Sequence, residues 1–193
     1  DSNEAAYEKA AEDKNAIAYV SSGVELDENK VKTVTIYGND LTRSFYLAYK
    51  GELSDVEDDF VRYISTQGQE VVSEKYTAVA KPGSFLSDKA GGEIKIGGST
   101  SAAPLVKELA DKYMEINPNT KITVTETDSG NGLTGEMEGT YDIGMSSREL
   151  KSYENELLTK VEIAKDEVHV IVNKENPIGR SSIEELGEMY TGK

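Results

Sequence analysis

The chain of 193 residues contains no cysteine, no tryptophan and a single histidine. The absence of cysteine excludes disulfides, thiolate nucleophiles and cysteine-ligated zinc. One histidine argues against a histidine-based triad and a multi-histidine metal centre, and His169 lies in the apolar run 168–172, where a structural role is expected. The sequence contains no G-x-S-x-G motif, so a serine hydrolase is not indicated. We therefore expect no catalytic residue, no metal and no cofactor.

Basic residues are also fewer than acidic residues. The chain has 21 Lys and Arg and 36 Asp and Glu, which gives a net charge of −15. A nucleic acid or an anionic membrane surface needs a basic face, so neither is expected as a partner. No apolar run approaches the roughly 18 residues of a membrane span. The first residues carry no signal-peptide pattern. The charge does not exclude one small anion held by short-range hydrogen bonds.

Strands and helices alternate from residue 93 onward, which predicts an α/β layered domain with a largely parallel sheet. The strands expected there are 93–96, 122–126, 141–145, 161–163 and 168–172. The helices expected between them are 102–116, 133–138, 148–158 and 182–190. Residues 80–92 are rich in Gly, Pro and Ser and are predicted to be a linker.

The part before this linker has its own mixture of elements. The expected strands are 16–20, 31–37 and 44–49, and the expected helices are 5–13, one after Ser54, and 67–74. Ser54 and Glu57 have the spacing of a capping box. Asp58-Asp59 and Glu184-Glu185 are interpreted as solvated helix faces rather than as acid–base pairs.

Three loops rich in Ser and Thr follow successive predicted strands and precede predicted helices. They are residues 97–101, 128–132 and 146–148. Open α/β sheets bind ligands at the carboxyl ends of their strands, and helix N-termini favour anions. Each loop on its own is more simply explained as a helix cap. Three together predict a site for a small oxyanion. An ion pair is expected for both Arg43 and Arg148, and Arg148 has the better claim to belong to the site.

The motifs resemble one known family. Gly97-Gly98-Ser99-Thr100-Ser101-Ala102-Ala103-Pro104 resembles the opening of the phosphate-binding proteins of bacterial ABC phosphate transporters. Asp128-Ser129-Gly130-Asn131-Gly132 resembles their second loop, and 142–150 their third. Residues 170–177 and 183–193 resemble the segment that follows. Residues 15–20, 41–51 and 60–79 resemble the far end of the same family, so C-terminal sequence precedes N-terminal sequence.

The resemblance implies one lobe of a type II periplasmic-binding-protein fold, with a mostly parallel sheet, flanking helices and circularly permuted order. Residues 1–79 and 93–193, joined by the linker 80–92, are expected to form one domain, with the second lobe missing from this chain. The reversed order is explained by a window across two tandem receptor copies or by a circular permutation. We favour the tandem window at this point.

The family's phosphate ligands match Thr100, Ser101, Ser129 and Ser147 in this sequence. Ser147 stands where many relatives have Asp. Secondary candidates are Ser99, Gly130, Asn131, Ser146 and Arg148. The resemblance implies capture of inorganic phosphate without catalysis and its delivery to a membrane permease. It also implies an extracytoplasmic location, lipid-anchored at the cell surface or periplasmic.

Two other functions stay open. The first is an interaction or sensing module that keeps the lobe but not transport. The second is a receptor for sulfate or molybdate, because the hydroxyl of Ser147 both donates and accepts hydrogen bonds. With half of the cleft absent, we expect the 193-residue chain to bind phosphate weakly or not at all.

Overall fold

The computed structural model describes residues 2–38 and 41–191, and the chain divides into two compact units. Unit 1 consists of residues 1–42 and 167–193, and unit 2 of residues 43–166. The chain enters unit 2 within β4 (Thr42–Tyr49) and leaves it within β8 (Thr159–Asn173). Asp1 and Gly192-Lys193, which belong to segments cited above, lie outside the described residues.

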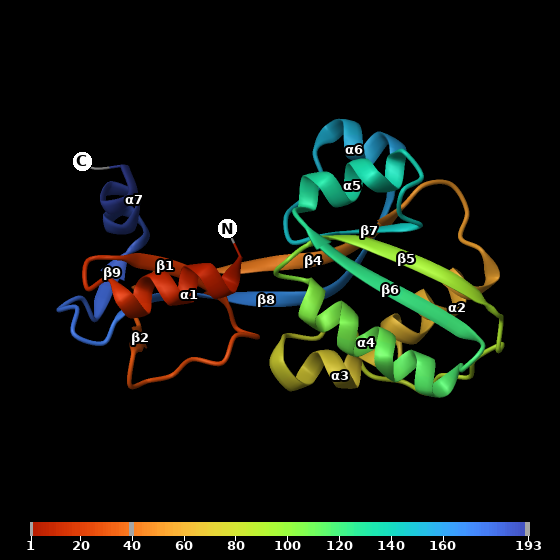
Figure 1. Cartoon of the computed structure of the whole chain (residues 1–193), viewed down its shortest axis with the longest axis horizontal. Coiled ribbons are helices and arrows are strands. Elements are labelled where there is room, and N and C mark those ends of the chain that lie inside the picture. Colours follow the sequence, from red (N-terminus) through yellow and green to blue (C-terminus); the bar gives the residue numbers. More distant parts are fainter. Residues whose placement is uncertain (1, 39–40, 192–193) are drawn as a thin grey trace. The chain divides into compact units, whose positions relative to one another are not determined.

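Unit 2 is built on a sheet in which β4, β7 (Ile143–Ser146), β5 (Gly92–Ser99) and β6 (Thr120–Thr127) lie in that order. β5 is parallel to both β6 and β7, whereas β4 is antiparallel to β7. Figure 1 shows helices on both faces of this sheet. One face carries α2 (Asp55–Ser65), α3 (Gly68–Lys75) and α4 (Ala103–Ile116), and the other α5 (Ser129–Met137) and α6 (Ser152–Leu157). The predicted α/β lobe with flanking helices is confirmed.

The core of unit 2 follows from the alternation of side chains along the strands. In β4, Phe45 and Leu47 join the large cluster beneath α2, α3 and α4. The residues between and after them, Tyr46 and Ala48, join a smaller cluster with Leu133 of α5. A strand that is apolar on both faces is typical of a sheet covered by helices on both sides.

The predicted linker, residues 80–92, lies within unit 2 and has no helix or strand before β5 begins at Gly92. Asp59 of α2 anchors it. The Asp59 carboxylate accepts hydrogen bonds from the Ser87 hydroxyl (2.6 Å), the Asp88 N–H (2.9 Å) and the Tyr113 hydroxyl (2.7 Å). Asp59 is fully buried, so the interpretation of Asp58-Asp59 as a solvated face is wrong for Asp59. The grouping of 1–79 and 93–193 into one domain stays a prediction.

Unit 1 has a small sheet in which β1 (Ile17–Ser21) and β2 (Val31–Thr33) are antiparallel to β8. A separate pair consists of β3 (Thr35–Tyr37) and β9 (Arg180–Ser182), which are parallel. α1 (Asn3–Glu12) packs with Ile171 of β8, and α7 (Ile183–Thr191) packs with its neighbours Val170 and Val172. β8 therefore buries side chains on both faces here as well.

Several elements differ from the sequence predictions. The strand predicted at 31–37 is divided into β2 and β3 at Val34, whose N–H donates to the carbonyl of Val170 (2.8 Å). The strands predicted at 161–163 and 168–172 are parts of the single strand β8, and β9 was not predicted. The helix predicted at 148–158 begins only at Ser152. His169 lies in β8 opposite Val20, which agrees with a structural role.

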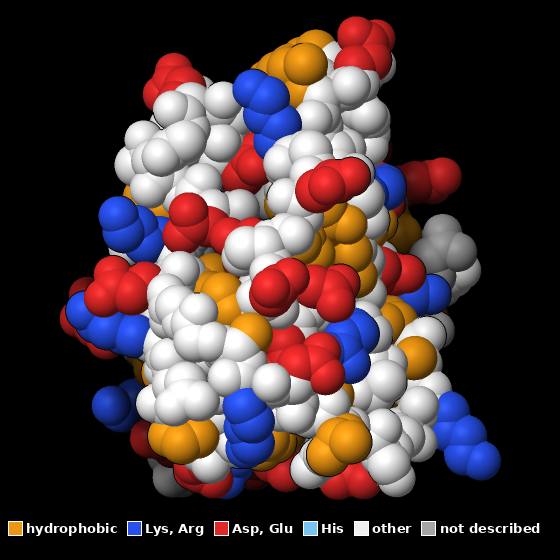
Figure 2. Space-filling view, turned by 90° about the vertical axis from the view of Figure 1, so that its right-hand side faces the viewer, with side chains coloured by type: hydrophobic (Ala, Val, Ile, Leu, Met, Phe, Trp, Pro, Cys, Tyr) orange, Lys and Arg blue, Asp and Glu red, His pale blue; other side chains and the backbone are white. Residues whose placement is uncertain are grey.

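The surface and the helices bear on possible surroundings. Figure 2 shows acidic and basic side chains interspersed over one face of the molecule. Among residues 2–38 and 41–191, no helix has the length and apolar character needed to cross a membrane.

Candidate functional site

The three hydroxyl-rich loops leave neighbouring strands of unit 2 at the same edge of the sheet. β5 places Ser99 opposite Thr127 of β6 and Gly98 opposite Met145 of β7. Parallel strands that end together bring the loops after them together. We call these loops the first (residues 99–101), the second (128–131) and the third (146–148).

Glycines allow α5 to lie directly on β5. A Cβ atom on Gly132 would overlap the Cα of Gly98 and lie 2.5 Å from the carbonyl oxygen of Gly97. Gly98 itself has a φ of +143°, which disfavours other residues, and a side chain there would overlap the carbonyl of Met145. Because Gly98 and Gly132 have no side chains, the second loop can lie close to β5, the strand that leads into the first loop.

Ser129 and Ser147 meet across the second and third loops. The N–H of Ser147 donates to the Oγ of Ser129 at 3.1 Å. Because this hydroxyl accepts here, its own proton is available to another acceptor. The structure thus brings together two of the four main candidates, while the N–H of Ser147 is already engaged.

The first loop is organised by Ser99. Its hydroxyl oxygen accepts from the N–H groups of Ser101 (3.2 Å) and Ala102 (3.3 Å), and its side chain is buried. Ser99 therefore shapes the turn. The N–H of Ser101 is occupied, but the hydroxyls of Thr100 and Ser101 make no hydrogen bond to the described residues. α4 begins directly afterwards, and no side chain caps its N-terminus.

The carboxylate of Asp128, in the second loop, caps the N-terminus of α5. Asp128 is the N-cap of α5, where Oδ1 accepts from the N–H of Asn131 (2.9 Å) and Oδ2 from the Asn131 side-chain amide (2.5 Å). Asn131 is therefore committed to the cap. A Cβ on Gly130 would lie 3.1 Å from Asp128 Oδ1, so Gly130 makes room for that carboxylate. The negative charge offsets the positive end of the α5 dipole.

Replacing this cap gives a direct test of its contribution. We expect Asp128→Ala to lower the free energy of unfolding by about 1 kcal/mol, because two hydrogen bonds at the α5 N-terminus are lost. Asp128→Asn keeps an efficient cap and removes only the charge, so its free energy of unfolding should stay close to that of the unmodified chain. Urea denaturation followed by circular dichroism measures both. Equal losses in the two variants would show that charge, not capping, is the important property.

Arg148 and Glu154 hold the third loop. The guanidinium donates to both carboxylate oxygens of Glu154, at 2.8 and 2.9 Å, and the Glu154 side chain is only 1% exposed. These hydrogen bonds lower the pKa of Glu154 to about 2. Ser146 is buried, and its hydroxyl donates to the carbonyl of Arg148 (2.8 Å) and accepts from its N–H (3.2 Å). The ion pair predicted for Arg148 is confirmed, and it neutralises the arginine's charge.

Arg43 is also paired, as predicted. Its Nε lies 2.9 Å from Oδ2 of Asp166, a carboxylate that is fully buried. This ion pair joins the first and last residues of unit 2.

The resulting site offers neutral donors rather than a free positive charge. The hydroxyls of Thr100, Ser101, Ser129 and Ser147 remain available at the loops, while Arg148 is balanced by Glu154. The described residues contain no group of three His, Asp or Glu side chains that would hold a metal ion. Such an arrangement suits a small anion that is bound by short hydrogen bonds.

Comparison with known proteins places the chain in a family. A family model described as "PBP superfamily domain" matches residues 83–193. Phosphate-binding protein PstS 2 of Streptococcus pneumoniae (strain TIGR4) is 35% identical over 192 residues, which cover 93% of this chain and 66% of that protein. PstS 2 of Streptococcus agalactiae is 30% identical over 199 residues, covering 95% and 67% respectively. The chain belongs to the PstS phosphate-binding proteins of the PBP superfamily.

A solved structure of a PstS relative supports this membership. The crystal structure of a phosphate-binding protein of a phosphate ABC transporter from S. pneumoniae TIGR4 superposes with a TM-score of 0.81 at 32% identity. The match covers all of this chain and 80% of that one. The chain therefore has the fold of this family, as the sequence motifs predicted. It spans 66% of the length of the S. pneumoniae PstS 2 proteins.

Two residues of this candidate site were not predicted. Asp128 was quoted only as part of a motif, although an acidic residue just before a helix is a common N-cap signal. Glu154 was not singled out at all. Its carboxylate accepts from the N–H of Lys151 (2.7 Å) three residues earlier, and that spacing is the signal that would have identified it. The ligand roles of Thr100, Ser101, Ser129 and Ser147 stay predictions.

Proposed function

We propose that the chain binds inorganic phosphate as part of an extracytoplasmic substrate-binding protein of an ABC transporter and catalyses no reaction. The observation that carries this proposal is the hydrogen bond between Ser147 and Ser129, which joins the second and third loops. The first loop and the uncapped N-terminus of α4 lie at the same sheet edge. Together they provide hydroxyl and N–H donors for an oxyanion.

The names of the relatives support the choice of anion, since those proteins are called phosphate-binding proteins. In the proposal, Thr100, Ser101, Ser129 and Ser147 are the main ligands. Ser99, Ser146, Gly130 and Asn131 shape the loops through the contacts described above, and Arg148 positions the third loop. The net charge of −15 predicts little electrostatic attraction at long range, so hydrogen bonds select the ligand.

The transport role requires further partners that belong to the proposal. These are a membrane permease, a second lobe that closes over the ligand, and a lipid anchor or a periplasmic location. We also propose that the order of the segments is a circular permutation. One match of 192 residues covers 93% of this chain, so S. pneumoniae PstS 2 has both segments in the order found here, which argues against a junction of tandem copies.

Titration with phosphate tests the proposal at the level of residues. In amide NMR spectra of the 193-residue chain, millimolar phosphate should shift the signals of residues 100–101, 129 and 147. Ser129→Ala and Thr100→Val should each remove most of the effect, because each deletes one hydroxyl donor. Thr123→Val, on an exposed position of β6, is the matched control and should leave the shifts unchanged.

Two results would count against this account. Absence of shifts at these loops would reject phosphate binding by the chain. Micromolar or tighter binding in calorimetry would instead contradict the expectation that half of the cleft is missing.

Selectivity is the second property to test. The Ser147 hydroxyl can donate to a fully ionised oxyanion, so sulfate is expected to compete with phosphate. Ser147→Asp should favour phosphate, because a carboxylate accepts the proton of hydrogen phosphate and repels sulfate. Parallel titrations with the two anions measure this change. An unchanged ratio of affinities would place residue 147 outside the ligand contacts.

A further inference from the structure

One buried carboxyl group of unit 2 lacks a partner for one of its oxygens. Glu136 lies in the last turn of α5 and is only 6% exposed. Its Oε1 accepts a hydrogen bond from the N–H of Lys50 at 2.5 Å. Its Oε2 has no hydrogen-bond partner, and within residues 2–38 and 41–191 it is the only buried side-chain oxygen or nitrogen of this kind. Buried polar atoms are nearly always paired, so Glu136 departs from the common pattern.

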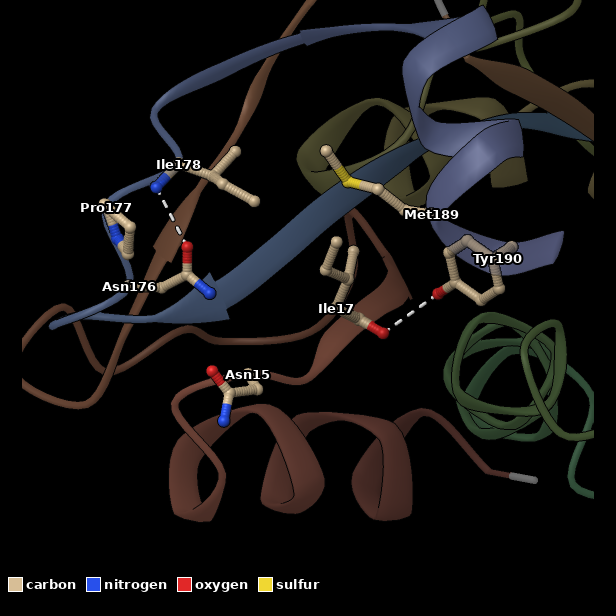
Figure 3. Close-up of a pocket in the computed structure, with 7 residues that line it drawn as sticks. All are labelled: Asn15, Ile17, Asn176, Pro177, Ile178, Met189 and Tyr190. Atoms are coloured by element: carbon tan, nitrogen blue, oxygen red, sulfur yellow. Dashed lines mark hydrogen bonds between the residues drawn. The ribbon is translucent and has the colours of Figure 1, made fainter. Parts of the chain in front are cut away.

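Buried amide side chains in the chain show the usual pairing. Asn176 in unit 1 donates to the carbonyl of Lys14 (2.6 Å) and accepts from the N–H of Ile178 (2.9 Å), although it borders a pocket (Figure 3). Gln69 of α3 is buried as well, and its side chain makes hydrogen bonds with four backbone groups. An amide both donates and accepts, whereas an ionised carboxylate only accepts. Glu136 therefore needs a donor at each oxygen to be buried with its charge.

The surroundings favour the neutral form of Glu136. Burial raises the pKa of this carboxyl group, the N–H and the charge of Lys50 lower it, and the charge of Glu57 in α2 raises it again, with a net increase. The last turn of a helix is also the negative end of its dipole, which disfavours a carboxylate there.

Further residues that pack against α5 are uncharged at neutral pH. They are Gly97 of β5, Gly144 of β7, Tyr46 and Ala48 of β4, Leu150, and Tyr141, whose ring lies against Gly135. The hydroxyl of Tyr46 donates to Glu149. Lys50 and Glu57 are therefore the charged residues that act on Glu136, and they act in opposite directions.

We propose that Glu136 is a proton-linked switch that controls the attachment of α5 to the segment after β4. With a proton bound, the neutral carboxyl group stays buried and Oε1 holds the N–H of Lys50. Without the proton, the charge at Oε2 has no donor, and the contact opens so that water reaches the carboxylate. Ser129 begins the same helix, so the switch connects pH to the second loop. The proposal does not depend on which anion unit 2 binds.

Stability measured against pH tests the switch. Because the pKa of Glu136 is higher in the folded chain than its ordinary value of 4.5, its contribution is complete below that value and is lost as the pH rises through the folded-state pKa. Glu136→Gln keeps an acceptor for Lys50 and removes the charge. The ratio of the unfolding constant of the unmodified chain to that of Glu136→Gln should rise at least about fivefold between pH 4 and pH 8 in urea denaturation.

Glu138→Gln is the matched control, because Glu138 lies at the same end of α5 but is exposed. The same ratio for this variant should not change with pH. An equal rise for the two variants would overturn the proposal. A constant ratio for Glu136→Gln would also overturn it, and that result is expected if a buried water solvates Oε2 and keeps the carboxylate ionised.

Amide hydrogen exchange tests the switch without any variant. Protection factors, corrected for the intrinsic effect of pH on exchange, report local opening. Between pH 4 and pH 8, those of residues 133–137 should fall at least about fivefold relative to those of residues 105–113 in α4, on the other face of the sheet (Figure 1). Equal changes in the two helices would contradict opening at α5 and overturn the proposal.

Discussion

Gly132→Ala is expected to lower the free energy of unfolding of unit 2 by about 3 kcal/mol, the upper end of the usual cost of overpacking. The added methyl group would meet the backbone of Gly97 and Gly98 rather than the end of a flexible side chain. α5 would have to move away from β5, and the Ser129–Ser147 contact would lengthen. Urea denaturation followed by circular dichroism measures the loss of stability.

Gly187→Ala provides the matched control for this substitution. Gly187 also lies in a helix, but a Cβ atom there meets nothing within 4 Å. Alanine is favoured over glycine inside a helix by roughly 0.5–1 kcal/mol, so this variant should be as stable as the unmodified chain or slightly more stable. A small effect of Gly132→Ala, similar to that of Gly187→Ala, would show that α5 does not need the close approach.

Arg148→Ala is the second substitution with a large expected effect. It leaves the carboxylate of Glu154 buried without its bidentate partner. Breaking one side of a buried ion pair typically costs about 3–5 kcal/mol, and we expect about 3 kcal/mol here because the arginine is partly exposed. Lys121→Ala removes the exposed Lys121–Glu93 pair and should cost less than about 0.5 kcal/mol.

The pH dependence of stability gives an independent measure of the same pair. The pKa of Glu154 falls from its usual value of 4.5 to about 2 in the folded chain. Because the pKa of Glu154 is lower in the folded chain than in the unfolded chain, its ionisation stabilises the fold at pH values above the unfolded-state pKa. This contribution, about 3 kcal/mol, is lost as the pH falls from near 5 to 2. Glu154→Gln should flatten the pH profile in that window. A profile that Glu154→Gln leaves unchanged would mean that other carboxylates dominate.

The sequence predicted the position of the loops better than their internal bonding. Strand alternation and Ser or Thr after each strand were sufficient to expect that Ser129 and Ser147 lie close together, because parallel strands end at one edge. The engagement of the Ser101 N–H by Ser99 depends on the path of one turn. The formation of the ion pair between Arg148 and Glu154 depends on where α6 begins. Sequence patterns do not determine either of these details.

Tertiary contacts also decide where a helix begins and which of its residues are buried, and local sequence patterns did not predict these details. The helix after the second loop was predicted to begin at 133, but α5 begins at Ser129 and includes glycines, which disfavour helices. Close packing of Gly132 on β5 outweighs that intrinsic preference. The buried role of Asp59 was also missed, since its partners Ser87 and Tyr113 lie 28 and 54 residues away. Contacts of this range arise from the tertiary fold alone.

The ion pair between Arg43 and Asp166 has a consequence for evolution of the chain. It fastens the two ends of unit 2 to each other, so the polypeptide of this unit is nearly a closed ring. The ends of such a chain can lie at different surface segments, because joining the original ends and opening the chain elsewhere changes its conformational entropy little. Residues 80–92 have no helix or strand before β5 and are mostly exposed, so they form a surface segment of this kind. Gene rearrangement at that segment therefore requires no new contacts within the ring.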